Sequence, residues 1–333
     1  MSAPLIEVAD LSVRLNTSRG PAEAIRNVSF ALARGETLGL VGESGCGKSI
    51  TALALMGLLP DSAVVGGSIR FDGRDLVGLP DRDYCRLRGN RISMIFQEPM
   101  TALNPMHTIG RQVAEPMRRH TGCSAADARE QAIALLDRVG LPDAAKRVGA
   151  YPHQLSGGQR QRVTIAMALA CQPDVLIADE PTTALDVTIQ RQILDLIADL
   201  VAERGMSMIL ISHDLGVIGE NVRRMMVMYG GTVVESGPTD AIFARMGHPY
   251  AQGLFRARPR LGAKKGTRLK TIVGTVPELA DLPKGCAFAD RCALVEDRCR
   301  VALPEAVEVA ADHRVRCLRT DVSMTDAVGV SLA

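Results

Sequence analysis

The chain has 333 residues, enough for one large domain with a smaller one, or for two domains. Its 39 Lys and Arg against 37 Asp and Glu are near balance, which disfavours a nucleic-acid binder that relies on a basic surface. Apolar residues make up 47%, a composition typical of globular rather than disordered proteins.

The N-terminus carries no recognisable targeting or membrane signal. The stretch MSAPLIEVADLSV has neither a basic start nor an apolar core. No segment of the chain approaches the roughly 20 apolar residues that cross a bilayer. We therefore expect a cytoplasmic chain that can still dock on a membrane protein.

The first β-rich runs are short and separated by turns. Residues 6–15, 28–32 and 68–71 are rich in β-formers, and Asp72-Gly73 follows as a turn. This pattern predicts an antiparallel layer.

Four later runs are continuously apolar, as central parallel strands covered on both faces are. They are residues 37–41, 92–96, 175–179 and 208–212.

Helices are predicted over 126–140 and 187–204, where apolar residues recur at three-and-four spacing, with Gly140 and Gly205 as stops. Residues 225–229, the Gly230-Gly231 turn and 232–236 predict a further hairpin. The apolar face of the second helix is predicted to consist of Val187, Ile193, Leu194, Ile197 and Val201.

A phosphate-binding loop follows the strand 37–41. The sequence GESGCGKS lies between that strand and the helix-compatible TALALMGLL, which is the P-loop pattern in its required setting. Backbone N–H groups of such a loop converge on phosphate oxygens, Lys48 reaches the terminal phosphates, and the Ser49 hydroxyl coordinates Mg²⁺. A chance glycine-rich turn is disfavoured by this context. The predicted nucleotide-binding residues are Gly42, Glu43, Ser44, Gly45, Cys46, Gly47, Lys48, Ser49 and Ile50.

An acidic pair ends the apolar strand 175–179. Asp179 is expected to hold Mg²⁺ through water, and Glu180 to polarise the attacking water as general base. The structural alternative, a capping pair at a strand-to-helix turn, is weakened by the P-loop in the same chain.

A second anion-binding turn lies in LSGGQRQR, residues 155–162. Ser156 and two glycines precede a helix start, but no lysine accompanies them. Two phosphate-binding surfaces in one chain indicate that two chains pair, each presenting this turn to the nucleotide held by the other.

With these motifs in order, the chain resembles the ATP-binding subunits of ATP-binding-cassette (ABC) transporters over about residues 4–320. The other landmarks are Gln97 in IFQEP, Asp186 in TALD and His213 in ISHD. The resemblance implies an α/β fold: a P-loop ABC nucleotide-binding domain with a mixed sheet core, an antiparallel β layer and a helical signature subdomain.

The resemblance also implies residue roles. Gln97 would contact Mg²⁺ and the attacking water, and His213 the γ-phosphate; with Lys48 and Glu180 they form the expected catalytic set. Asp186 would link the two sites of the dimer. The partner's ATP would be clamped by the signature residues Ser156, Gly157, Gly158 and Gln159.

One position departs from the family pattern. An aromatic residue after the first strand usually stacks on adenine, whereas the equivalent place here has Leu15. We expect adenine to rest on an aliphatic side chain, with looser selection of the base.

Eight cysteines fall into two groups. Cys46, Cys85, Cys123 and Cys171 are scattered, and we expect small, partly buried residues there. The other four are spaced C-x₅-C-x₆-C-x₁₇-C, a pattern open to free thiols, an iron–sulfur cluster or zinc, whereas a cytoplasmic chain disfavours disulfides. They are Cys286, Cys292, Cys299 and Cys317.

The tail narrows the resemblance. HPYAQGL at 248–254, the cysteine tail and FQEPMTALNPMHTIG at 96–110 look like the oligopeptide/dipeptide (peptide/nickel) importer subfamily. In that subfamily the cysteine set is suspected to hold a [4Fe–4S] cluster. We predict an ABC ATP-binding domain over residues 1–255, and a linker with a C-terminal extension over 256–333.

The resemblance implies an energy-coupling ATPase that imports di- or oligopeptides. Its expected partners are two transmembrane permease subunits, a second ATP-binding subunit, identical or paralogous, and an extracytoplasmic solute-binding protein; no nucleic acid is expected. The expected location is the cytoplasmic face of the bacterial inner membrane. The alternatives are import of nickel or another small solute, and a soluble non-transport ABC ATPase.

Overall fold

The computed structural model describes residues 3–183, 185–257 and 271–320. These residues group into two compact units. The first unit holds the described residues of 1–5, 32–37 and 72–211, and the second those of 6–31, 38–71 and 212–333. The predicted linker over 256–275 lies mostly outside the described residues, so the boundary at 255 stays a prediction.

The core of the first unit is a parallel sheet. Its three strands run in the order β8–β7–β6, with Ile92 beside Val175 and Asp179 beside Ile211. Continuous burial of these strands confirms what their apolar runs predict. Phe96, predicted to end its strand, lies beyond it and is 43% exposed. The strands are β6 (Ile92–Ile95), β7 (Val175–Asp179) and β8 (Ser207–Ser212).

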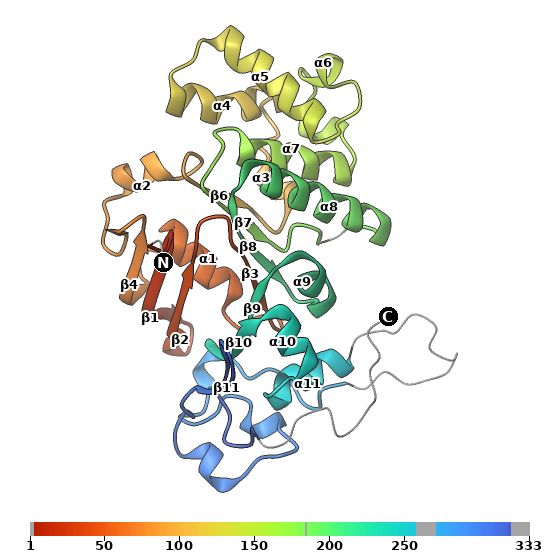
Figure 1. Cartoon of the computed structure of the whole chain (residues 1–333). Coiled ribbons are helices and arrows are strands. Elements are labelled where there is room, and N and C mark those ends of the chain that lie inside the picture. The colour runs from red at the N-terminus through yellow and green to blue at the C-terminus, as the bar shows by residue number, and fades with distance from the viewer. Residues whose placement is uncertain (1–2, 184, 258–270, 321–333) are drawn as a thin grey trace. The chain divides into compact units, whose positions relative to one another are not determined.

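Helices make up the rest of the first unit, and Figure 1 shows α4, α5, α6 and α7 gathered together. The predicted helix at 126–140 begins one residue earlier, where the Ser124 hydroxyl accepts the Asp127 N–H, and it ends before Gly140. The unit also has a short strand, β5 (Arg74–Asp75). Its helices are α2 (Asp81–Leu87), α3 (Pro99–Ala102), α4 (Ile109–Thr121), α5 (Ala125–Arg138), α6 (Ala144–Arg147), η1 (Pro152–Gln154), α7 (Gly157–Leu169) and α8 (Val187–Arg204).

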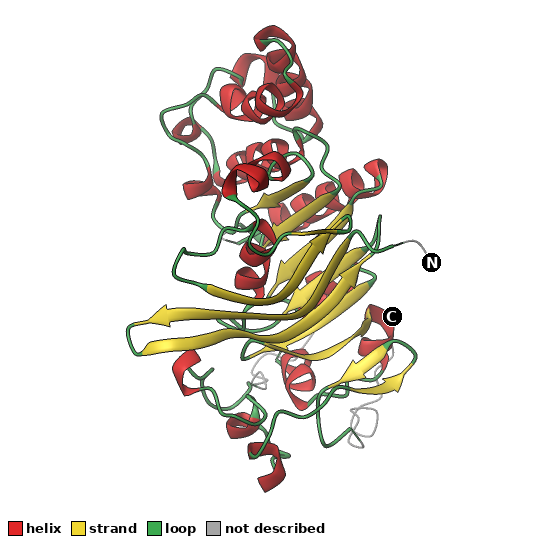
Figure 2. Ribbon diagram, turned by 90° about the vertical axis from the view of Figure 1, so that its left-hand side faces the viewer, coloured by secondary structure: helices red, strands yellow, loops and turns green. Residues whose placement is uncertain are grey.

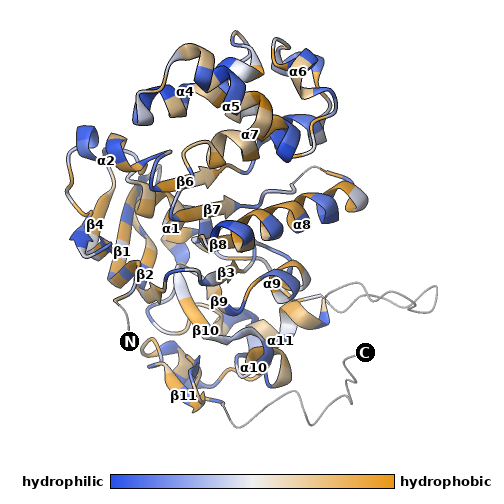
Figure 3. Ribbon diagram, turned by 45° about the horizontal axis from the view of Figure 1, so that its top comes forward, coloured by the Kyte–Doolittle hydropathy of each residue, from blue (hydrophilic) through white to orange (hydrophobic). Residues whose placement is uncertain are grey.

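Helix α8 is amphipathic, with both polar and apolar stretches along its length (Figure 3). The prediction of its apolar face is wrong at Val187, which is 82% exposed as the first residue of the helix after the Asp186 cap. Gly205 ends the helix in a left-handed conformation with φ 62°, as predicted.

The second unit contains two groups of strands. In the antiparallel group, β1 pairs β4 with Ile6 opposite Phe71. In the other, β3 runs parallel to β9 and β9 antiparallel to β10, which makes this part of the sheet mixed. Both the antiparallel layer and the mixed sheet are as predicted; strands are yellow in Figure 2. The strands are β1 (Ile6–Thr17), β2 (Gly20–Leu32), β3 (Thr37–Val41), β4 (Val64–Phe71), β9 (Arg224–Tyr229), β10 (Thr232–Pro238), β11 (Val307–Ala310) and β12 (His313–Val315).

The remaining elements of the second unit are helical and short. No helix in the described part of the chain is long and apolar enough to cross a membrane. The described residues 271–320 contain all four clustered cysteines and are called the cysteine module below. The helices are α1 (Lys48–Met56), α9 (Leu215–Asn221), α10 (Thr239–Ala244), α11 (Pro249–Arg256), η2 (Leu279–Asp281), η3 (Ala289–Arg291) and η4 (Asp297–Arg300).

Candidate active site

The P-loop joins β3 to α1 in a bend that only glycine permits at its ends. A Cβ on Gly42 would meet the Met228 carbonyl oxygen at 2.3 Å, and Gly47 caps α1 with φ 107°. Lys48 is 4% exposed, and its Nζ donates to the carbonyl oxygens of Gly42 at 2.7 Å and Glu43 at 3.1 Å. The loop therefore has the strand–loop–helix setting that the sequence predicts, with its lysine folded back onto it.

The second residue of the loop, Glu43, is fixed by contacts that the sequence did not reveal. Its N–H donates to Tyr250 Oη at 2.7 Å. Its carboxylate accepts two hydrogen bonds from the Arg291 guanidinium, at 2.6 and 3.1 Å. Arg291 lies 248 residues after Glu43 in the chain, so no sequence pattern predicts their contact.

The acidic pair lies in the first unit. Asp179 ends β7 and is 4% exposed, and Glu180 follows in a left-handed conformation with φ 45°, its N–H bonded to the Ile211 carbonyl. The Gln97 amide donates to Glu180 Oε2 at 3.2 Å, and the Thr183 hydroxyl donates to the same oxygen at 3.1 Å. The structure thus brings together two of the predicted catalytic residues, Gln97 and Glu180.

The signature turn forms the expected helix start. The Ser156 hydroxyl accepts the Gln159 N–H at 3.4 Å, and the Gln159 side chain accepts the Ser156 N–H at 3.1 Å, so the two residues form a capping box for α7. A Cβ on Gly158 would lie 3.1 Å from Ile189 Cγ2, in the first turn of α8. Asp186 caps that helix by accepting the Ile189 N–H at 3.0 Å. Signature turn and Asp186 therefore lie close together in this unit.

His213 belongs to the second unit, as do Lys48 and Ser49. It is exposed directly after β8, and Asp214 next to it caps α9 by accepting the Gly216 N–H at 2.6 Å. The predicted site residues are thus divided between the two units. The second unit holds the P-loop and His213, and the first holds Gln97, the acidic pair, the signature turn and Asp186.

A cavity of about 370 Å³ lies beside the P-loop within the second unit. Its walls are Ser44 and Gly45 of the loop, the hairpin turn 17–19, and residues 276–280 of the cysteine module. Arg19 of that hairpin pairs with Asp281 through two hydrogen bonds of 2.6 and 2.7 Å, which joins two of the three walls. Leu15, at the family's aromatic position, is half-buried in β1.

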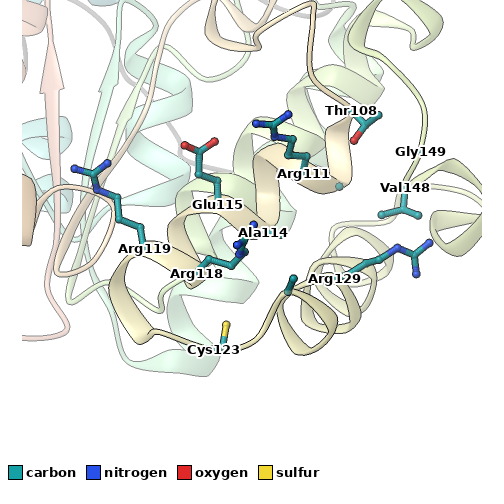
Figure 4. A pocket seen from close by; sticks show the side chains of 12 residues that line it. Thr108, Arg111, Ala114, Glu115, Arg118, Arg119, Cys123, Arg129, Val148 and Gly149 are labelled. Carbon is teal, nitrogen blue, oxygen red and sulfur yellow. The ribbon is translucent and has the colours of Figure 1, made fainter.

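The first unit has a larger cleft, of about 610 Å³, lined mainly by α4 and the start of α5. Figure 4 shows its charged side chains: Arg111, Glu115, Arg118 and Arg119 on α4, and Arg129 on α5. Four arginines against one glutamate make this a basic cleft, and we keep that name for it.

The four clustered cysteines converge on one small cavity of about 20 Å³, which His248 also lines. All four are free thiols. Burial raises the pKa of Cys286 to about 11, and it raises the pKa values of Cys292 and Cys317 too. Among the described residues no group of three or more His, Cys, Asp or Glu is arranged to hold a metal ion as it stands.

His248 gives this cavity a polar wall. Its Nδ1 accepts the Tyr250 N–H at 3.1 Å, so the proton of the neutral ring is on Nε2. Nε2 is buried and has no hydrogen-bond partner among the described residues. Complete burial lowers the pKa of His248 to about 3, which keeps the ring neutral. The scattered cysteines are free and at least partly buried, as predicted; they are Cys46, Cys85, Cys123 and Cys171.

Comparison with known families and proteins identifies two matched regions. The ABC transporter family profile matches residues 25–183, and the profile of the oligopeptide/dipeptide transporter C-terminal region matches residues 234–299.

Two relatives match nearly the whole chain. A Brucella melitensis protein, provisionally named a peptide import ATP-binding protein, is 49% identical over 95% of this chain and 97% of its own length. The Mycobacterium tuberculosis oligopeptide transport ATP-binding protein OppD is 48% identical over 96% of this chain and 52% of its own length.

Solved structures with the same fold are ABC cassettes. The dimeric post-hydrolysis state of the ATP-binding cassette MJ0796, bound to ADP and phosphate, matches with a TM-score of 0.64 and 28% identity, over 70% of this chain and 98% of that one. Clostridium perfringens cbiO1, part of the transporter complex cbiONQ, matches with a TM-score of 0.61 and 26% identity, over 73% and 92%.

Proposed function

This chain belongs to the ATP-binding subunits of ABC transporters, and from that premise we propose that it powers the import of di- and oligopeptides. As a family member it binds ATP and hydrolyses it to ADP and phosphate to drive transport. The observation that carries the cargo proposal is the C-terminal region, residues 234–299, whose profile is that of oligopeptide and dipeptide transporters. Nickel or another small solute is the alternative cargo. The same region offers no support for a soluble non-transport ATPase.

We assign hydrolysis to residues that lie in both units. Backbone N–H groups of the P-loop and Lys48 bind the phosphates, and Glu180 takes the proton of the attacking water. The hydrogen bond between Gln97 and Glu180 supports this, because it orients the carboxylate of the base. His213 contacts the γ-phosphate, a role taken from the family resemblance.

The donor groups fit Mg²⁺, because they are hard oxygens: the Ser49 hydroxyl, the Gln97 amide and the Asp179 carboxylate. Burial of Asp179 at the end of β7 leaves its carboxylate anchored by a rigid strand. When bound, the ion neutralises charge on the β- and γ-phosphates.

We assign the signature turn to the nucleotide of a second ATP-binding subunit, identical or paralogous. The N-terminus of α7, with Gly157 and Gly158 behind Ser156, presents backbone N–H groups to an anion. We assign to Asp186, whose neighbours Leu185 and Ile189 adjoin this turn, the link between the two sites of such a dimer.

The basic cleft is our proposed docking site for a cytoplasmic helix of a permease subunit. Its charge commits the proposal to a partner segment that carries acidic side chains, because four arginines face it with one glutamate. Two permease subunits and an extracytoplasmic solute-binding protein complete the proposed importer, with this chain peripheral on the cytoplasmic face of the inner membrane.

The cavity beside the P-loop is where we place adenine. It adjoins Ser44 and Gly45, and its walls include the side chains of Val276 and Leu279. Because position 15 is a leucine and not an aromatic residue, we expect these apolar walls to contact the flat faces of the base. Selection between ATP and GTP is then expected to be loose.

We also propose that the cysteine module binds a [4Fe–4S] cluster through Cys286, Cys292, Cys299 and Cys317. Four thiols on one cavity, with the unpartnered Nε2–H of His248 in its wall, match the donor set and the hydrogen bonding of such clusters. The cavity of about 20 Å³ is too small for a cluster until the thiols move apart. Iron and acid-labile sulfide in anaerobically purified protein, lost in a Cys299→Ser variant, are expected; full retention in that variant contradicts the assignment.

The cargo is tested by uptake of labelled di- and tripeptides in the native host. A chromosomal Glu180→Gln strain is expected to lose peptide uptake and keep uptake of unrelated solutes. Unchanged peptide uptake, with nickel uptake lost instead, would assign the chain to the alternative cargo.

A further inference from the structure

The P-loop is held in place from outside itself. All three polar groups of Glu43 are engaged: its N–H by Tyr250, its carbonyl oxygen by Lys48, and its carboxylate by Arg291. Two of these three contacts come from residues 249–291, between β10 and β11 in the chain.

Arg291 is a rigid anchor. Its side chain is 5% exposed and that of Glu43 is 28% exposed, so the pair is largely shielded from solvent. Two parallel N–H···O bonds fix the carboxylate in one orientation. Two further donors are used as well: Nε donates to the Val273 carbonyl oxygen at 3.1 Å, and Nη1 donates to Tyr229 Oη at 3.3 Å.

Aromatic packing holds the guanidinium from its sides. Its carbon lies 5.8 Å from the Tyr229 ring centre and 5.9 Å from that of Phe288. These rings and Tyr250 contact one another edge-on or tilted, with centres 4.6 to 5.3 Å apart. The same ring cluster therefore supports both Arg291 and the tyrosine that binds the Glu43 N–H.

The turn that carries Arg291 is fixed by backbone bonds of the cysteine module. The Cys286 N–H donates to the Cys299 carbonyl at 2.8 Å, and the Ala289 N–H donates to the Cys286 carbonyl at 3.0 Å. Arg291 directly precedes Cys292. The cysteine module thus presents Arg291 to the P-loop on a scaffold of its own.

We propose that Arg291 is a positioning residue for ATP binding, which acts through Glu43 to hold the P-loop in its phosphate-binding conformation. The inference rests on the proposed ATP site and extends it, because it makes the cysteine module part of the nucleotide site. Binding phosphate through backbone N–H groups is strongest when the loop is ordered before the ligand arrives. Without Arg291, part of the ATP-binding energy is used to order the loop. The affinity for ATP therefore falls, while the rate of the chemical step does not.

The test measures Mg·ATP binding to the full chain by calorimetry, together with ATPase rates of the assembled transporter. Arg291→Ala and Glu43→Gln are each expected to weaken ATP binding about tenfold, or about 1.4 kcal/mol. The double variant is expected to bind no more weakly than the weaker single, because both remove one interaction. At saturating ATP, kcat of the transporter with Arg291→Ala is expected to stay within about twofold of wild type.

Arg298→Ala is the matched control, since Arg298 pairs with Glu296 on the surface of the same module and is 59% exposed. Arg291→Lys keeps the positive charge but cannot form the bidentate hydrogen bonds, and it replaces the alanine variant if that variant does not fold. ATP binding about threefold weaker than wild type is expected for it. Unchanged affinity in a folded Arg291 variant, or additive losses in the double variant, would overturn the inference. A wild-type chain that does not bind ATP would instead overturn the proposed function.

Discussion

Glu235 ties the cysteine module and α11 to the mixed sheet, and its neutral isostere provides a sharp test of that packing. Its side chain is fully buried in β10. Oε1 accepts the Gly247 N–H at 2.8 Å and lies 2.8 Å from His313 Nε2, and Oε2 accepts the His248 N–H at 2.9 Å. One carboxylate therefore joins β10, β12 and the turn before α11.

Glu235→Gln replaces one acceptor oxygen by an NH₂ group. Whichever way the amide is turned, that group faces at least one buried N–H, which then has no acceptor. A buried donor left unsatisfied costs about 1–3 kcal/mol, and with the lost charge on the bond to His313 we expect about 2–4 kcal/mol in the free energy of unfolding.

Thermal unfolding of the full chain measures this loss. For large domains each kcal/mol lowers Tm by about 2–4 °C, so a decrease of about 4–16 °C is expected. Glu308→Gln, on the exposed β11, is the matched control and is expected to leave Tm unchanged. If Glu235→Gln has the same Tm as the control variant, the carboxylate does not join the three segments.

Three further predictions concern binding, acid stability and assembly. Lys48→Ala is expected to abolish ATP binding in calorimetry, with Lys146→Ala as an exposed control; retained affinity would remove Lys48 from the phosphate site. Because the pKa of His248 is about 3 in the folded chain and about 6.5 unfolded, the unfolded state takes up the proton first, and stability falls as pH drops below about 6.5. Between pH 7 and 5, protonation of His248 lowers the free energy of unfolding by about 2 kcal/mol, which is measured as a falling Tm. If Tm of the His248→Asn variant falls with pH as much as that of wild type, other groups cause the fall. Arg118→Glu in the basic cleft is expected to reduce co-purification with the membrane subunits at unchanged ATP affinity, and full assembly of that variant would exclude the cleft as the docking site.

Local sequence signals predicted the elements that carry the nucleotide site. Continuous apolarity located β3, β6, β7 and β8, because strands covered on both faces need no polar side. The sequence also predicted helix ends: Gly205 follows the last residue of α8, and Ser156 caps the start of α7.

Features that depend on tertiary packing were not predictable in this way. Val187 fits the apolar repeat of α8, yet as the first residue of that helix it is 82% exposed. The pair of Arg291 and Glu43 joins residues 248 positions apart, and no local sequence pattern links them. The basic cleft depends on which faces of α4 and α5 remain uncovered, which periodicity alone does not fix.

Glu180→Gln in the assembled transporter is the first measurement to make, because it removes only the general base that we assign to ATP hydrolysis. We expect wild-type ATP affinity, loss of phosphate release, and a closed dimer of ATP-binding subunits that retains nucleotide. Phosphate release at a rate comparable to wild type would show that Glu180 is not the base.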